Sequence, residues 1–410
     1  MLVNVFIAKA FSAKTSHLCY NLIMKTLIEL YDEKPIENVL GTEMFRPEEM
    51  VILCPPESVS DKVLRESLNK YFEYRGCPVK ITVVPASLLD AAKVEKQLQK
   101  VLETHEDCAI DISGGTDASL FAAGVICGST PVFTYSGKRN SFFEIQNAPF
   151  ARSLKCDVTL DARSCFLMAG GTLLPGREDN ALLKDKLEDI DALFAIFRKY
   201  RRGWRRQIGY IQAISSSEPG ELHAEGPKTV RVDHGQATAD EAMLRELANA
   251  GIIKDLQIGQ ERIAFRFPDE TVRFWLRDIG SVLELQVYRA CLEAGCFDDV
   301  VLSAVVNWEG GQTQRNAVTN EIDVVAVQGV RPIFISCKTS EIRTEALNEL
   351  AVLRDRFGGR SSRAIIVTSA PASRNRALMR MRAAELNIEV IELGDLAKDR
   401  LIARLKGEDF

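Results

Sequence analysis

The sequence predicts an α/β protein with a Rossmann-like domain, a winged-helix-like linker domain and a restriction-endonuclease-like domain, in that order. Near the N-terminus, short and almost continuously apolar runs alternate with helical patterns, as expected for a parallel sheet covered on both faces. Near the C-terminus the order is helix, three strands, helix, strand. The length of 410 residues also calls for several domains, since one domain usually holds roughly 100–200 residues.

Composition excludes several classes of protein. The chain has 52 Lys and Arg against 57 Asp and Glu, and 46% of its residues are hydrophobic, which rules out wholesale disorder. No apolar run reaches the roughly 18 residues of a membrane span, and the first ten residues lack signal-peptide features. The ten cysteines include no CxxC pair, and there are only four histidines. Both observations argue against a Cys/His zinc site. We therefore expect a cytoplasmic protein with reduced thiols and no membrane partner.

Residues 1–154 are expected to form the Rossmann-like domain. The predicted elements are a strand at 2–7, a helix at 16–30, strands at 50–54, 79–84 and 108–112, and helices through 64–71, 91–102 and 118–126.

A glycine-rich turn is the main feature of this domain. The strand at 108–112 runs directly into Gly114, Gly115 and Thr116, and then into a helix. Such a turn exposes backbone amides at a helix N-terminus, where phosphate or another anion binds well. Tight strand–helix turns also need glycine for structural reasons alone, so a binding role and a purely structural role both stay open.

Residues 155–279 are expected to form the linker domain. A helix at 240–250 precedes two strands joined through Gly259 and Gln260, which is the outline of a winged helix; a plain connector of the same shape is an equal alternative. The cationic run 198–206 contains Tyr200 and Trp204. It is either a helix end favoured by the helix dipole or a surface on which single-stranded bases stack.

Residues 280–410 are expected to form the third domain, and two of its predicted strands carry polar side chains. Period two puts Glu321 and Asp323 on one face of their strand, and Ser336 and Lys338 on one face of the next. Paired carboxylates on an apolar strand are costly unless a positive charge lies between them. Hard divalent cations take oxygen ligands, and a nearby lysine can orient an attacking water. The plainer alternative is a surface Asp–Lys ion pair.

These residues resemble the PD-(D/E)xK nuclease superfamily. By this resemblance Asp323 is the metal-binding aspartate, Lys338 the catalytic lysine and Glu284 the acid of the leading helix. Ser336 stands where the family usually has Asp or Glu, so it is the departure from the pattern.

The resemblance also implies a metal site for Mn²⁺ or Mg²⁺. Its ligands would be Asp323 and the backbone carbonyl of Cys337, with Glu321 or an acid of the following helix, Glu345 or Glu349, in place of the usual carboxylate.

An arginine-rich segment follows this site. From Arg354 to Arg382 the chain has eight arginines and one acid. Such a run is usually a solvated face, but beside a nuclease-like core phosphate contact is the favoured interpretation. The expected nucleic-acid-binding residues are Arg374, Arg376 and Arg380.

With all three segments in place, the Gly-Gly-Thr turn looks like that of the CARF domain (CRISPR-associated Rossmann fold), and the whole chain is similar to the CARF–nuclease effectors of type III CRISPR defence. In that family a dimer of CARF domains binds cyclic oligoadenylate, usually cyclic tetra-adenylate, across its two-fold axis. The loop after the first strand and the Gly-Gly-Thr loop hold the ring. Here those residues would be Lys9, Ala10, Phe11 and Ser12, and Gly114, Gly115 and Thr116.

The resemblance implies a homodimeric, metal-dependent endonuclease that is activated by cyclic tetra-adenylate. DNA nicking is favoured, with single-stranded DNA or RNA cut as well. The alternative is a ligand-responsive DNA-binding regulator whose nuclease-like domain is inactive because of Ser336. Only the nuclease would produce nicks that need the ligand.

Overall fold

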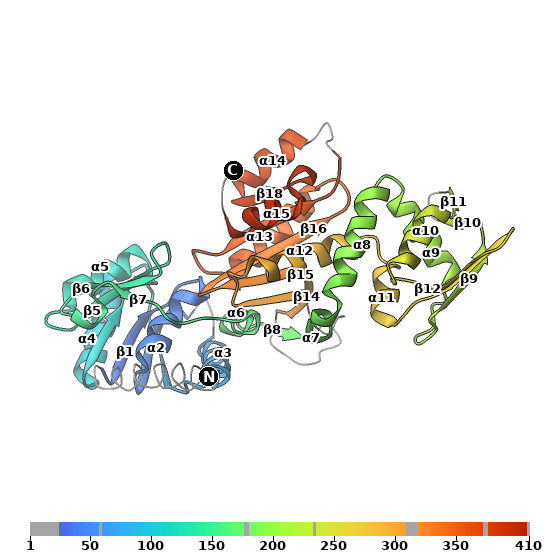
Figure 1. Ribbon diagram of the computed structural model, residues 1–410. Coiled ribbons are helices and arrows are strands. Elements are labelled where there is room, and N and C mark those ends of the chain that lie inside the picture. Colours follow the sequence, from blue (N-terminus) through green and yellow to red (C-terminus); the bar gives the residue numbers. More distant parts are fainter. Residues whose placement is uncertain are drawn as a thin grey trace, which may run out of the picture.

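The computed structural model describes residues 24–56, 60–175, 180–232, 235–308, 318–371 and 376–407. Figure 1 shows two large sheets and a group of small strands. The sheet near the N-terminus lies at one end, the small strands lie at the other, and the second large sheet lies between them. Within the described residues, no helix is both long enough and apolar enough to cross a membrane.

The N-terminal sheet has the strand order of a Rossmann-like fold. Its strands are β1 (Thr26–Leu30), β2 (Glu49–Cys54), β3 (Lys80–Pro85), β4 (Cys108–Asp111), β5 (Val132–Ser136), β6 (Ser141–Gln146) and β7 (Leu154–Lys155). They lie in the order β3-β2-β1-β4-β5-β6-β7. The first five are parallel, and β6 and β7 are antiparallel. The order 3-2-1-4-5 reverses between β1 and β4, which is where such folds bind ligands.

Helices cover both faces of this sheet, as expected for parallel strands. They are η1 (Pro35–Asn38), α2 (Leu40–Phe45), α3 (Asp61–Tyr74), α4 (Ala91–Thr104), α5 (Asp117–Ile126) and η2 (Pro149–Ala151). Helices α2 and α3 share a core with Leu27 and Ile52 on one face. Helices α4 and α5 share a core with Ile28 and Val51 on the other.

The first strand is where the sequence prediction was wrong. Thr26–Leu30 was expected at the end of a helix over 16–30, but it is the central strand β1 and is buried throughout. Leu27, Ile28 and Leu30 fit a helical stripe as well as a buried strand, and a short apolar run does not separate the two. Pairing with β2 and β4 on both sides decides it. The expected strand 2–7 lies outside the described residues.

The middle segment contains helices, two small sheets and one strand, β8, of the C-terminal sheet. Its elements are α6 (Ala162–Met168), β8 (Thr172–Leu174), α7 (Asn180–Leu183), η3 (Lys184–Lys186), α8 (Leu187–Tyr200), α9 (Trp204–Ile214), β9 (His223–Pro227), β10 (Thr229–Val232), β11 (Gly235–Thr238), α10 (Glu241–Asn249), β12 (Lys254–Ile258), β13 (Arg262–Arg266) and α11 (Glu270–Trp275). Helix α10 precedes the antiparallel pair β12–β13, to which β9 adds a third strand. This is the expected winged-helix outline.

The C-terminal sheet follows the expected order of elements. They are α12 (Ser281–Ala294), β14 (Asp299–Asn307), β15 (Thr319–Gln328), β16 (Arg331–Lys338), α13 (Thr344–Phe357), β17 (Arg363–Thr368), α14 (Arg376–Glu385), β18 (Ile388–Ile391), η4 (Leu393–Asp395) and α15 (Lys398–Lys406). The strand order is β18-β17-β16-β15-β14-β8. Because β8 pairs with β14, the segment 155–279 supplies an edge strand of this sheet. The boundaries of the three predicted domains stay predictions.

The cores of the two large sheets are continuous. One buried cluster joins α2 and α3 of the N-terminal part to α6, α13 and one face of the C-terminal sheet. A second cluster joins the helices of the middle segment to α12 and the opposite face of that sheet. Helices α12 and α13 therefore cover opposite faces of the C-terminal sheet, and the N-terminal part packs against the α13 face.

A pair of acids lies buried at the centre of the N-terminal sheet. Glu29 on β1 and Asp111 on β4 are direct register partners. Burial raises the pKa of Asp111 to about 7 and raises that of Glu29 well above its usual value, with the charge of Asp111 as the second cause. Gly41 of α2 packs against both, and a Cβ added there would overlap Asp111 Oδ2.

We predict that Gly41→Ala destabilises the protein by about 1–3 kcal/mol, because the buried carboxyl has no room to move. The matched control is Gly209→Ala in α9, whose added Cβ would lie 3.6 Å from Val232 Cγ1 in ordinary contact. That change should be neutral or stabilising by up to about 1 kcal/mol. Thermal unfolding of both variants checks this, and equal melting temperatures would contradict the packing described.

Candidate nuclease site and ligand turn

The strand that carries the candidate aspartate is irregular at that residue. Ser303 of β14 has a φ of 52°, and the register of β14 with β15 omits the step from Ser303 to Asp323. Ile322 shares a buried cluster with Val325, whereas Val324 belongs to the other cluster. Strict alternation is therefore broken near Asp323, yet the charges of both Glu321 and Asp323 act on Glu284 of α12. A residue in the left-handed region locally redirects a strand.

The Asp323 side chain is turned toward β16 and accepts from three donors there. Its Oδ2 receives the backbone N–H of Cys337 at 2.5 Å, the Ser336 hydroxyl at 3.2 Å and the Lys338 ammonium at 3.4 Å. The backbone pairing of β15 with β16 ends at Val324 and Ile335, so the Asp323 carboxylate joins the two strands just beyond that point. The structure thus brings together Asp323, Ser336 and Lys338, as the sequence predicted.

Glu284 lies in the first turn of α12, close to the same acids. Its pKa is raised to about 8, mainly by burial and then by the charges of Asp323, Asp278 and Glu321, while the charge of Lys338 opposes the rise. The structure therefore confirms that Glu284 faces the strand site. Four carboxylates thus lie close enough to interact, and a positive charge in addition to Lys338 would relieve their repulsion.

Asp278 is an acid of this site that the sequence analysis missed. Its Oδ2 accepts from the backbone amides of Gly280 and Ser281 at 2.9 and 2.7 Å and from the Ser281 hydroxyl at 2.9 Å. These hydrogen bonds fix the start of α12 and hence the position of Glu284 in its first turn. An acid three residues ahead of a helical run is the available sequence signal.

The two α13 acids suggested as substitutes for the usual carboxylate, Glu345 and Glu349, lie apart from Asp323. Glu349 accepts from the Asn320 side chain at 2.7 Å, and Asn320 accepts from Trp308 at 2.7 Å. Glu345 is exposed in the first turn of α13, on the face of the sheet opposite α12. Glu321 is exposed but close enough to raise the pKa of Glu284.

The donor set suits a hard cation that keeps part of its water. In the described part of the chain, no three His, Cys, Asp or Glu side chains gather closely enough to hold a metal ion. Mg²⁺ usually binds through one or two carboxylates, with water and substrate phosphate completing the shell. Asp323 with Glu284 or Glu321 fits that mode.

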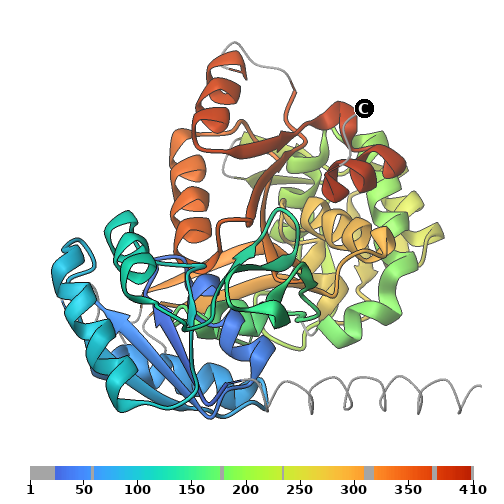
Figure 2. The same ribbon diagram turned by 90° about the vertical axis from the view of Figure 1, so that its left-hand side faces the viewer.

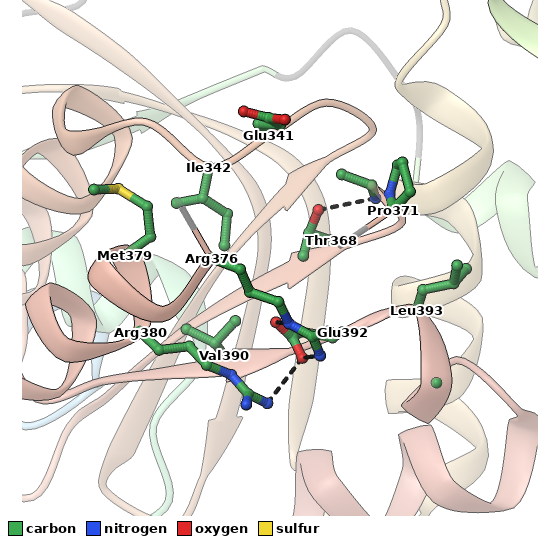
Figure 3. A pocket seen from close by; sticks show the side chains of 12 residues that line it. Glu341, Ile342, Thr368, Pro371, Arg376, Met379, Arg380, Val390, Glu392 and Leu393 are labelled. Carbon is green, nitrogen blue, oxygen red and sulfur yellow. Dashed lines mark hydrogen bonds and ion pairs between the residues drawn. The ribbon is translucent and has the colours of Figure 1, made fainter. Parts of the chain in front are cut away.

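The predicted nucleic-acid-binding arginines have an internal partner. Arg376 binds both carboxylate oxygens of Glu392, and Arg380 reaches Oε2 at 2.8 Å. Figure 3 shows both guanidinium groups turned toward this carboxylate at the wall of a pocket of about 360 Å³. Glu392 is only 8% exposed, so much of their charge is already compensated. Arg374 lies outside the described residues.

The Gly-Gly-Thr turn lies at the carboxyl edge of β1 and β4. A Cβ on Gly114 would lie 2.8 Å from the Leu30 carbonyl and 2.9 Å from Asp32 Cβ, and Gly115 has a φ of +95°. Thr116 caps α5 by accepting from the Ser119 amide at 3.3 Å and donates to the Leu88 carbonyl. Both glycines are thus required structurally. Lys9, Ala10, Phe11 and Ser12 lie outside the described residues.

The fold and the site together define an α/β protein in which a Rossmann-like domain is joined to a nuclease-type domain. Residues 269–406 match the family model of the Card1-like endonuclease domain, so the chain carries an endonuclease domain of this kind. No curated protein matches the chain.

Two solved structures share its fold over almost the full length. Protein VC1899 from Vibrio cholerae has a TM-score of 0.71 and 19% identity, covering 93% of this chain and 97% of that one. Can2 from Sulfobacillus thermosulfidooxidans, solved in complex with cyclic tetra-adenylate, has a TM-score of 0.67 and 16% identity, covering 92% and 98%. These matches confirm the predicted fold class. Together with the endonuclease-domain match, they bear out the predicted resemblance to CARF–nuclease effectors.

The raised pKa of Glu284 predicts a pH dependence of stability. Between its ordinary pKa of 4.5 and its folded pKa of about 8, the folded chain binds more protons than the unfolded chain, so stability falls as pH rises. In metal-free buffer, Glu284→Gln should therefore raise the melting temperature by about 2 °C or more at pH 8.5 and change it little at pH 5.

The exposed residue Glu345 supplies the control, Glu345→Gln, which should leave the pH profile unchanged. Parallel profiles for wild type and Glu284→Gln would show that Glu284 does not face the acids of this site.

Proposed function

We propose that this chain is a homodimeric, metal-dependent endonuclease, activated by cyclic tetra-adenylate, that nicks DNA and cuts single-stranded DNA or RNA in type III CRISPR antiviral defence. The observation that carries the proposal is the contact of Asp323 with Lys338 inside a domain that matches an endonuclease family. Can2 supports the choice of activator, because a protein of the same fold was solved with this ring.

Lys338 is the proposed residue for positioning the attacking water. Its side chain is about one-third exposed, so a phosphodiester and a water can approach it. In the hydrolysis the water oxygen bonds to phosphorus, the bond to the leaving oxygen breaks, and one water proton goes to solvent or to the leaving oxygen. The positive charge of Lys338 stabilises the negative charge that develops on the phosphoryl oxygens. Ser336 keeps Asp323 oriented through its hydroxyl.

A divalent cation would be held by Asp323 and the Cys337 carbonyl, with Glu284 or Glu321 as a further acid. When bound, it supplies additional positive charge to the phosphoryl oxygens. The Cys337 N–H already points at Asp323, and the amide and carbonyl of one residue in an antiparallel strand face the same neighbour. The carbonyl is therefore on the correct side of β16.

We predict that Asp323→Ala and Lys338→Ala each lower cleavage of supercoiled plasmid at least ~100-fold, measured with Mn²⁺ and cyclic tetra-adenylate. Lys406→Ala, a change of an exposed lysine in the same domain, is the control and should leave the rate unchanged. Retained activity in either site variant would remove this site assignment.

The ring-binding site is proposed at the Gly114, Gly115 and Thr116 turn, together with Lys9, Ala10, Phe11 and Ser12. Acids border the turn, since Gly114 packs against Asp32 and Glu37. Burial raises the pKa of Glu37 to about 7, which reduces the negative charge that an anionic ring would meet at neutral pH.

An exposed apolar face supports the proposed dimer. Phe121 and Val125 are 65% and 59% exposed and lie four residues apart on α5, hence on one face. Helix α5 begins directly after the Gly-Gly-Thr turn. Packing of this helix against its copy would bring two such turns together at the two-fold axis, where one ring can touch both.

A direct contact between the two large parts supports ligand control. Arg360, just after α13, binds Asp32 Oδ2 at 2.6 Å, and its amide donates to Glu37 at 3.3 Å. Lys34 lies 3.6 Å from Asp355 of α13. Figure 2 shows the C-terminal part standing over the end of the N-terminal sheet. Because Gly114 packs against Asp32, a ring at the turn would act on a residue that α13 also holds.

We predict that Arg360→Ala lowers the stimulation of cleavage by cyclic tetra-adenylate by roughly 5-fold or more, the range of ordinary coupling between sites. Unstimulated cleavage should be unchanged, because Arg360 lies outside the nuclease site. Plasmid cleavage over a series of ring concentrations measures this.

Arg382→Ala is the matched control, since Arg382 is surface-exposed and binds only Glu385 in the described structure. Equal stimulation of wild type and Arg360→Ala would exclude this contact as the route between ligand and nuclease.

A further inference from the structure

A basic cavity lies between α9 and the hairpin β10–β11. It has a volume of about 700 Å³, and four arginines line it: Arg202, Arg205, Arg206 and Arg231. Arg206 donates to the backbone carbonyl of Gln236 at 2.9 and 2.6 Å. A neutral carbonyl holds the guanidinium in place without cancelling its charge.

A second cavity continues the first toward the nuclease domain. It has a volume of about 580 Å³ and shares Arg202, Arg205 and Ile279 with the first, so the two form one groove. Arg201 joins the lining and donates to the Ser369 carbonyl at 3.3 Å. Among the described residues, no aspartate or glutamate lines either cavity.

The far end of this groove reaches the candidate catalytic lysine. Thr339 and Ser340 line it and directly follow Lys338 in the chain. Ser369 also lines it and donates its amide to the Lys338 carbonyl at 3.1 Å. Ile279 lies between Asp278 and the start of α12, which carries Glu284. The groove therefore ends beside the residues that follow Lys338 on β16 and beside the segment that leads into α12.

The two sets of arginines differ in how their charge is compensated. Arg376 and Arg380 share the buried carboxylate of Glu392. Arg202 and Arg231 are exposed, and the described residues place no carboxylate within ion-pair distance of either. Exposed guanidinium groups without a carboxylate partner, here Arg202 and Arg231, are typical of a phosphate-binding surface, and the planar fork of arginine suits phosphate oxygens.

We infer that this groove, lined by Arg201, Arg202, Arg205, Arg206 and Arg231, is the substrate track: it binds the phosphodiester backbone of a nucleic-acid strand and delivers it to Lys338. The inference deepens the proposed function and rests on it for the cleavage step, but not for strand binding. Substrate binding is thereby assigned mainly to the middle segment, and the arginines of α14 contribute less to strand binding.

Strand binding is tested with full-length Arg202→Ala/Arg231→Ala and the charge-preserving pair Arg202→Lys/Arg231→Lys. The matched control is Arg245→Ala/Arg262→Ala, which removes the same charge from the same segment at residues that face Glu241 and Glu225. Fluorescence anisotropy of a labelled single-stranded DNA in EDTA measures affinity without cleavage, from 50 to 200 mM salt. Labelled single-stranded RNA and duplex DNA are parallel probes, and circular dichroism checks folding.

The alanine pair should weaken binding ~10-fold or more at 50 mM salt and lower the salt slope by about 1 for each arginine removed. The lysine pair should keep most of the affinity, and the control pair should match wild type. The probe that loses most identifies the strand type that occupies the groove.

Wild-type affinity in the alanine pair, an equal loss in the control pair, or no strand binding by the wild type would overturn the inference. Strand binding through the groove without any cleavage would leave the inference standing and refute the proposed nuclease. Cleavage that is unaffected by the alanine pair would refute the inference and leave the proposed nuclease standing.

Discussion

The candidate nuclease site depends on the hydrogen bonds that the Asp323 side chain accepts. One carboxylate oxygen accepts from the amide of Cys337, the hydroxyl of Ser336 and the ammonium of Lys338, so it joins β15 to β16 where their backbone pairing ends. The left-handed backbone of Ser303 on the other neighbouring strand permits this turn. Because charged hydrogen bonds are stronger than neutral ones, the same contact that closes the strand pair also places Lys338 for chemistry.

Charge is distributed unevenly around this contact. The charges of Asp323, Asp278 and Glu321 act on Glu284 and, after burial, raise its pKa. The groove along α9 carries arginines without lining acids. The formal charge of −5 is therefore an average over an acidic centre, where a cation is favoured, and a cationic path, where phosphate is favoured. In the proposed function, a phosphodiester bound in the groove would approach Asp323 and Glu284 with a cation between its oxygens and theirs.

Much of the C-terminal domain could be predicted from the sequence, because its signals are local. The order of elements, the Asp323–Lys338 pair and the leading acid Glu284 all follow from periodicity and short motifs. The break at Ser303, the pairing of Arg376 with Glu392 and the contact of Arg360 with Asp32 depend on residues distant in sequence, and periodicity carries no information about them. The central strand β1 was missed for a similar reason, since its five residues fit a helix until β2 and β4 pair with them.

The central claim is that a ring bound at the N-terminal sheet controls phosphodiester cleavage at the C-terminal sheet. Incubation of the wild-type protein with supercoiled plasmid, with and without Mn²⁺ and with and without cyclic tetra-adenylate, tests it most directly. Nicked plasmid is expected only when the metal and the ring are both present. Cleavage that is independent of the ring would contradict ligand control, and plasmid binding without nicking under every condition would favour a ligand-responsive DNA-binding regulator.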